Sequence, residues 1–199
     1  NFGTTEDIAA FLLTLRFFTM LRQFSQAPFS SKMPVFSKLK AQGETDLLSK
    51  MVIKRSFFVL ILFMIGSLAL FFGNDILFLI DANAQFIESE LILIMGLFWL
   101  YERFISLQTQ TTAIGNNIIF VKHQLISAIL ILLILYPAIN EIDILGIILT
   151  YGLVRFLVFR FEPVKFASEY LNIEKKIYYK MFGSIATVYI LIGLFLLIL

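Results

Sequence analysis

The chain has 199 residues, of which 59% are hydrophobic, 15% are charged and 23 are phenylalanine. This excludes an ordinary soluble domain and predicts an integral membrane protein. The formal net charge is only +2, and the absence of cysteine excludes disulfides, thiol nucleophiles and cysteine-ligated metals. A single histidine, His123, excludes a metal site built from a histidine cluster within this chain.

Apolar stretches along the sequence predict an all-α integral membrane fold, a bundle of about six transmembrane helices in one domain, 1–199. In chain order, the predicted helices cover about 5–36, 51–80, 88–113, 119–139, 143–161 and 177–199. Pro28 and Pro34 are expected to bend or interrupt the first of these helices. Residues 162–176 are polar and basic, and their pattern predicts an amphipathic helix in a cytoplasmic surface linker.

The charges between the predicted spans indicate the orientation of the chain. One side receives only acidic residues, which are Glu6, Asp7, Asp75, Asp81, Glu88, Glu90, Glu141 and Asp143. The other side receives the basic residues Lys32, Lys38, Lys40, Lys50, Lys54, Arg55, Lys122, Arg160, Lys165, Lys175, Lys176 and Lys180. Basic loops stay in the cytoplasm. We therefore predict a multi-pass protein of the plasma (inner) membrane, with residue 1 outside.

The first predicted helix has a polar and basic face. Within roughly 80° of one face lie Arg16, Thr19, Gln23, Gln26, Ser30 and Ser37. An arginine that faces lipid at this depth costs at least a few kcal/mol. The pattern therefore predicts a cationic cavity for an anionic substrate, with Arg16, Thr19, Arg22, Gln23 and Gln26 as substrate-binding residues. The alternative is structural, with Arg16 paired to a buried carboxylate and Arg22 extended to the cytoplasmic surface.

The third predicted helix offers a partner for this face. Glu102, Ser106 and Thr109 share one side of it, and Arg103 lies beside them. Because the first and third helices run in the same direction, we expect them to be neighbours, with Arg16 and Glu102 facing one polar cavity. Glu102 and Arg103 are candidates for an ion pair or a coupling-ion site, or for a simple pair near the headgroups.

The fifth predicted helix contains one arginine, Arg155. Arg160 and Lys165 follow it toward the same surface, so we expect Arg155 to extend its side chain to that surface rather than to bind a ligand.

The segment QAPFSSKMPVFSKLKAQGETDLLSKMVIKR resembles part of the polysaccharide flippases in the multidrug/oligosaccharidyl-lipid/polysaccharide exporter superfamily. The matching positions are Pro34, Ser37, Ala41, Gly43 and Glu44. The TTAIGNN turn and the apolar helix after it resemble a later connection in the same proteins. The resemblance implies that the chain is most of the C-terminal lobe of a two-lobe transporter, with a missing N-terminal lobe. It transfers no functional residue, because the cavity residues of that family follow no fixed motif.

The leading hypothesis is a transporter lobe that flips polyprenyl (di)phosphate-linked oligosaccharide across the membrane for cell-surface polysaccharide synthesis. Its partners would be the lipid-linked substrate, membrane lipid and the missing lobe, with no nucleic acid, no cofactor and no metal. The chain opens with Asn and ends within an apolar run, so we expect a fragment. One alternative is a cation-coupled drug exporter of the same superfamily. A membrane-embedded glycosyl- or acyltransferase is disfavoured, because the acidic residues have the spacing of solvated helix flanks; we expect no enzyme.

Overall fold

The computed structural model describes residues 5–114, 120–138 and 143–198, and each secondary-structure element in these ranges is helical. The elements are α1 (Thr5–Ser30), α2 (Met33–Ala41), α3 (Thr45–Ala69), η1 (Leu70–Phe72), α4 (Gly73–Leu79), α5 (Ser89–Ala113), α6 (Val121–Ala138), α7 (Ile144–Phe159), α8 (Glu162–Leu171) and α9 (Lys175–Ile198). The predicted all-α class is confirmed. The predicted turn at Gly115–Asn117 and the acidic residue Glu141 lie outside the described residues.

Several helices are long and apolar enough to cross a membrane. Among the described residues these are α1 with α2, α3 with α4, and α9, and α7 with α8 is a fourth if this pair, bent by 44°, forms one span. Helix α6 is apolar but shorter, and α5 carries Glu102 and Arg103 in its middle. The helices therefore fit a multi-pass membrane protein, and the count of six spans stays a prediction.

The helix predicted over 5–36 is two helices in the structure. α1 ends at Ser30 and α2 begins at Met33, with Pro34 in the first turn of α2. Proline has no N–H to donate, so it suits the start of a new helix better than the continuation of an old one. The α2–α3 connection then turns at Gly43, whose φ of +74° favours glycine.

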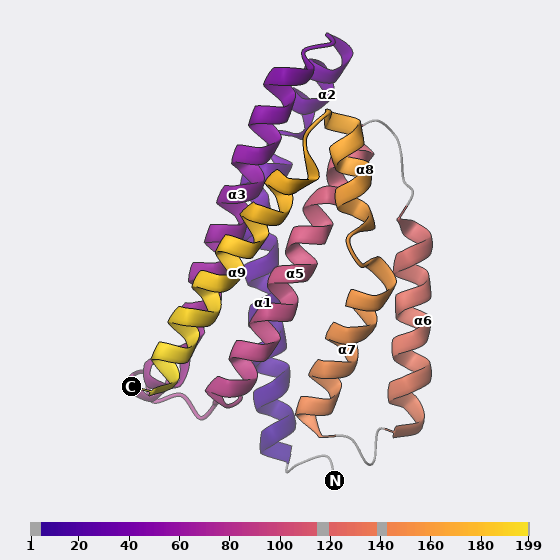
Figure 1. The fold of residues 1–199 in the computed structure, drawn as a ribbon. Coiled ribbons are helices and arrows are strands. Elements are labelled where there is room, and N and C mark those ends of the chain that lie inside the picture. Colours follow the sequence, from indigo (N-terminus) through magenta and orange to yellow (C-terminus); the bar gives the residue numbers. More distant parts are fainter. Residues whose placement is uncertain (1–4, 115–119, 139–142, 199) are drawn as a thin grey trace.

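The helices run up and down along one axis, and α5 lies in the middle of the bundle (Figure 1). α5 packs against α3, α8 and α9, while α1 packs on α3 and α6 packs on α7. The starts of α1, α5 and α7 lie at one end of the bundle, and α2, α8 and the start of α9 lie at the other (Figure 1). Acidic residues lie at the starts of α1, α5 and α7, and lysines cluster in the elements at the opposite end of the bundle. The two ends therefore differ in charge; which compartment each end faces stays a prediction.

The linker predicted over 162–176 contains the helix α8. This helix buries Val164, Ala167 and Leu171, and it exposes Lys165 and Glu169. The Ser49 hydroxyl of α3 donates a hydrogen bond to the carbonyl of Leu171 at 2.7 Å. The segment is thus amphipathic, as its sequence pattern indicated, and its apolar face covers one end of α5.

Candidate functional site

A polar cavity of about 290 Å³ lies between α1, α5, α6 and α7. Its walls carry three arginines and one glutamate, so the formal charge of the lining is +2. The lining residues are Arg22, Gln23 and Gln26 of α1, Tyr101, Glu102, Arg103, Ile105, Ser106, Thr109 and Gln110 of α5, Gln124 of α6, and Arg155 and Phe159 of α7. An excess of cations beside neutral hydrogen-bonding groups suits a polar anion.

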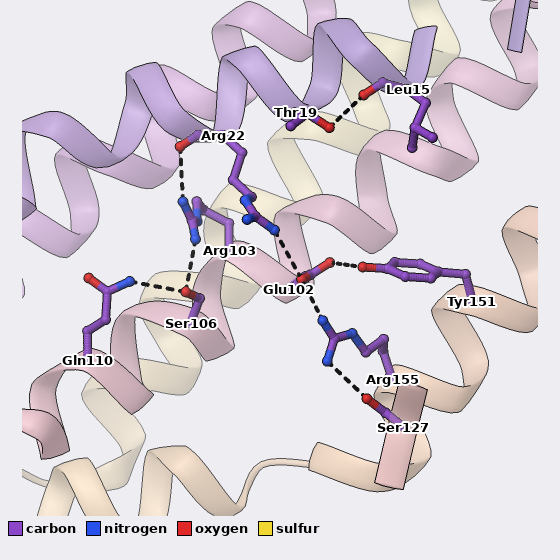
Figure 2. A network of polar contacts seen from close by, with 10 residues as sticks. All are labelled: Leu15, Thr19, Arg22, Glu102, Arg103, Ser106, Gln110, Ser127, Tyr151 and Arg155. Atoms are coloured by element: carbon purple, nitrogen blue, oxygen red, sulfur yellow. Dashed lines mark hydrogen bonds and ion pairs between the residues drawn. The ribbon is translucent and has the colours of Figure 1, made fainter. Parts of the chain in front are cut away.

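Glu102 is the centre of the charged network (Figure 2). Its Oε2 accepts a hydrogen bond from the Tyr151 hydroxyl at 2.6 Å, and its Oε1 accepts one from Arg155 Nη2 at 3.0 Å. Arg22 Nη1 lies 3.7 Å from the same Oε1, which makes a longer ion pair. The Glu102 side chain is only 13% exposed. One carboxylate therefore joins side chains of α1, α5 and α7.

Arg103 holds α5 against α1. Its side chain donates a hydrogen bond from Nη1 to the carbonyl oxygen of Arg22 at 3.0 Å and another from Nη2 to Ser106 Oγ at 2.9 Å. The residue is only 4% exposed, and it forms no ion pair within the described ranges. A buried guanidinium without a carboxylate partner leaves positive charge for an anion to neutralise.

Amides and a hydroxyl continue the network toward the C-terminal end of α5. Gln26 Nε2 donates to Gln110 Oε1 at 2.6 Å, and Gln110 Nε2 donates to Ser106 Oγ at 3.2 Å. These groups both donate and accept hydrogen bonds, as the hydroxyls of a saccharide do. This part of the cavity is therefore suited to a neutral polar group beside the charged one.

The expectation that Arg155 extends its side chain to the surface was wrong. Its side chain lies in the cavity, where it contacts Glu102 and donates from Nη1 to Ser127 Oγ at 3.0 Å. Its guanidinium also lies over the rings of Tyr151 and Phe159, 5.7 Å and 5.4 Å from their centroids. A carboxylate, a hydroxyl and two aromatic faces hold the charge inside the bundle, so the side chain does not need to extend to the surface.

The predicted binding residues of α1 divide into two groups. Arg22, Gln23 and Gln26 line the cavity, as expected. Arg16 is exposed on α1 outside the cavity, and the Thr19 hydroxyl donates to the Leu15 carbonyl at 2.9 Å. The predicted neighbourhood of α1 and α5 is present, but Arg22 takes the place beside Glu102 that was expected for Arg16. A substrate-binding role for any of these residues stays a prediction.

Sequence reasoning missed the contribution of α7. Tyr151 and Arg155 are four residues apart, so they lie on one face of a helix that is otherwise almost entirely apolar. That spacing is the signal that points to a polar face on α7. Ser127 and Gln124 of α6 could not be singled out, because single polar residues near a helix start are common at the membrane surface.

Comparisons of the chain with protein-family models, with curated proteins and with solved structures return no significant match. Its function is therefore inferred from the residues of this chain.

Proposed function

We propose that this chain is part of a transporter that flips a polyprenyl (di)phosphate-linked oligosaccharide across the membrane for cell-surface polysaccharide synthesis. The observation that supports this proposal is the polar cavity with an excess of arginine, which lies between the candidate span α1, the apolar helices α6 and α7, and the polar helix α5. Buried charges in apolar helices are costly and mark the paths of polar substrates.

The chemistry of the cavity fits such a substrate. A guanidinium forms two parallel hydrogen bonds with phosphate oxygens, and three guanidiniums line this cavity. Gln26, Gln110 and Ser106 supply neutral donors and acceptors for sugar hydroxyls. Transport needs binding and movement but no covalent step, so these groups are sufficient for the part of the work assigned to this chain.

The membrane arrangement is part of the proposal. We infer six spans, with the polar helix α5 shielded inside the bundle, the basic end in the cytoplasm and residue 1 outside the plasma (inner) membrane. A second lobe would face the exposed side of α1 that carries Arg16. Labelling of single cysteines tests the orientation, since the chain has no native cysteine. Lys38→Cys and Lys176→Cys should react only from the cytoplasm and Asp81→Cys only from outside; the reverse would contradict it.

A cation-coupled drug exporter is the second candidate, and Glu102 is the observation that favours it. A buried carboxylate can bind a proton or a cationic drug. Here, however, Tyr151, Arg155 and Arg22 already surround Glu102. Substrate charge separates the candidates in a transport assay, because the flippase should move anionic lipids and the exporter should move organic cations.

Flipping of a fluorescent polyprenyl-diphosphate saccharide by the intact protein in vesicles tests the main proposal. Arg155→Gln should lower the rate, normalised to inserted protein, by about tenfold or more, the equivalent of 1.4 kcal/mol. Arg155→Lys should keep partial activity, because it keeps the charge but loses the planar fork. If Arg155 only neutralises Glu102, the double variant Arg155→Gln with Glu102→Gln should recover full activity. Full recovery, or an unchanged rate in Arg155→Gln, would refute the substrate role.

Arg16 provides a separate test of the predicted binding face. Arg16→Ala should reduce flipping while membrane insertion stays intact, since loss of an exposed cation makes insertion less costly. The expected reduction depends on a substrate path along the exposed side of α1. Wild-type flipping by Arg16→Ala would restrict the path to the cavity beside Glu102.

A further inference from the structure

The polar cavity is followed by an apolar one between the same four helices. This second cavity measures about 340 Å³ and is lined by α1, α5, α6 and α7. Leu15, Phe98 and Ile148 are typical of its lining, in which Thr19, Trp99 and Tyr151 are the residues with a polar side-chain atom. Because the Thr19 hydroxyl is already bonded to a backbone carbonyl, the cavity offers few polar groups to a ligand.

Two aromatic side chains form the boundary between the cavities. The Trp99 and Tyr151 rings are stacked, with their centroids 6.3 Å apart and an angle of 23° between their planes. On the polar side, the guanidinium of Arg22 lies 5.9 Å from the Trp99 ring centroid, and the Tyr151 hydroxyl donates to Glu102. Both aromatic residues also line the apolar cavity. The change from polar to apolar surroundings therefore occurs across a single layer of side chains.

The order of residues along the helices places the two cavities one after the other along the bundle, and together we call them the crevice. In α1, Leu15 precedes Arg22, and in α7, Ile148 precedes Arg155. Seven residues of helix separate the members of each pair, which corresponds to about 10 Å along the axis. A ligand that fills both parts must be anionic at one end and apolar at the other.

The direction of the crevice matches that of a lipid. In α1 and α7 the residues of the polar part come later than those of the apolar part. These helices end toward the end of the bundle formed by α2 and α8 (Figure 1), and both of those helices carry lysine. The apolar part follows toward the middle of the helices. A lipid in the leaflet on the basic side has its headgroup and its chain in the same order.

We propose that the crevice binds one amphipathic anion along its length. A phosphate-type head lies between Arg22, Arg103 and Arg155, and part of an apolar chain lies beside Leu15, Phe98 and Ile148. This inference rests on the proposed function, because it takes the polar cavity as the head-group site. It adds a site for the apolar tail of the ligand within this bundle, so both ends of the substrate are recognised.

Trp99 is the only tryptophan of the chain and lines the apolar part, so its fluorescence reports on that part directly. The protein is placed in nanodiscs of phosphatidylcholine and titrated with a polyprenyl phosphate that carries bromine on its polyprenyl tail. Bromine quenches tryptophan fluorescence at short range. We expect saturable quenching. Inorganic phosphate should compete for the head-group site without quenching.

Leu135→Phe on α6 fills part of the apolar cavity, and Leu133→Phe is the matched control, since Leu133 is 66% exposed and lines neither part. We expect Leu135→Phe to lower the affinity for the brominated probe by about tenfold or more, and Leu133→Phe to bind the probe with the wild-type affinity. Inhibition by inorganic phosphate should be unchanged in both. Leu15→Phe on α1 should repeat the effect from the opposite wall, which separates it from misfolding of α6.

The outcomes separate this inference from the proposed function. If both Leu135→Phe and Leu15→Phe bind the probe with wild-type affinity, the site for the apolar tail is overturned and the head-group site is not. The same follows if brominated phosphatidylcholine quenches as strongly as the brominated polyprenyl phosphate. If Arg155→Gln leaves the affinity for both phosphate compounds unchanged, the head-group site itself falls, and the proposed function falls with it. Brominated phosphatidylglycerol identifies the source of the anion: a preference for polyprenyl phosphate assigns the crevice to the carrier, and equal quenching assigns it to a bilayer phospholipid.

Discussion

Helix α5 has two sides that are built in different ways. Toward α3 and α9 it presents Gly96, and a Cβ at this position would overlap the hydroxyl of Tyr189 and lie 2.5 Å from that of Ser67. Toward α1 and α7 it presents Glu102 and Arg103, which line the polar cavity. A glycine lets helices approach closely, whereas buried charges need partners with good hydrogen-bond geometry. The first side therefore depends on shape, and the second depends on charge.

Loss of the central carboxylate, Glu102, should cause the largest loss of stability on either side of α5. Glu102→Ala leaves Arg22 and Arg155 without a carboxylate, so we expect the free energy of unfolding to fall by about 3 kcal/mol. Denaturant titration in detergent micelles measures the change. Glu90→Ala is the control on the same helix, because Glu90 is exposed, and it should change the value by less than about 0.5 kcal/mol. Equal stability of the two variants would show that the network contributes nothing to the fold.

A single methyl group should test the close-packed side. Gly96→Ala forces Tyr189 and Ser67 to move, and we expect a loss of about 2 kcal/mol in the free energy of unfolding. Gly183→Ala on α9 is the matched control, since a Cβ there meets no atom within 4 Å and alanine favours a helix. A neutral Gly96→Ala would contradict the close approach of α5 to α3 and α9.

The hydroxyl of Tyr151 donates one hydrogen bond to a charged group, and a single substitution removes that bond alone. Tyr151→Phe keeps the ring stacked on Trp99 but removes the donor to Glu102, and the expected loss is about 1.5 kcal/mol. The measurement is again the free energy of unfolding, with Tyr136→Phe as the control because Tyr136 is 82% exposed. The bond would be shown to be weak if the two variants had the same stability.

The smallest effect is expected for the hydrogen bond on the other side of α5. Tyr189→Phe removes a 3.0 Å bond between the Tyr189 and Ser67 hydroxyls. Bonds between neutral side chains of membrane helices contribute about 0.6 kcal/mol on average, so we expect a loss of that size. A double-mutant cycle with Ser67→Ala isolates the pair. A loss above that for Tyr151→Phe would reverse the order of the two sides.

Much of the candidate site was predictable from helical spacing. Glu102, Ser106 and Thr109 were expected on one face of α5 with Arg103 beside them, and all four line the cavity. The spacing in α1 also indicated a polar face, but it did not show which part of that face meets α5. Arg22 lies about 120° around the helix from Arg16, so the rotation of α1 about its axis decides which arginine reaches Glu102.

The role of α7 was not predictable in the same way. Tyr151 and Arg155 read equally well as a pair near the membrane surface, because long side chains can carry a charge out of the apolar region. The packing of α7 beside α5 brings Arg155 within 3.0 Å of Glu102, and this contact joins residues 53 positions apart. No local pattern encodes that distance.

The amino-acid sequence by itself determined that this protein is helical, apolar and different in charge at its two ends. Composition, the length of apolar stretches and periodicity depend only on residues that are close along the chain, so they can be interpreted without knowledge of the packing. The tertiary structure alone decided that Arg22 and Arg155 share Glu102, that Arg103 lacks an ion pair among the described residues, and that an apolar cavity lies between the same helices as the polar one. These features depend on how each helix is rotated and which helix lies beside it, and close packing of whole helix surfaces sets both.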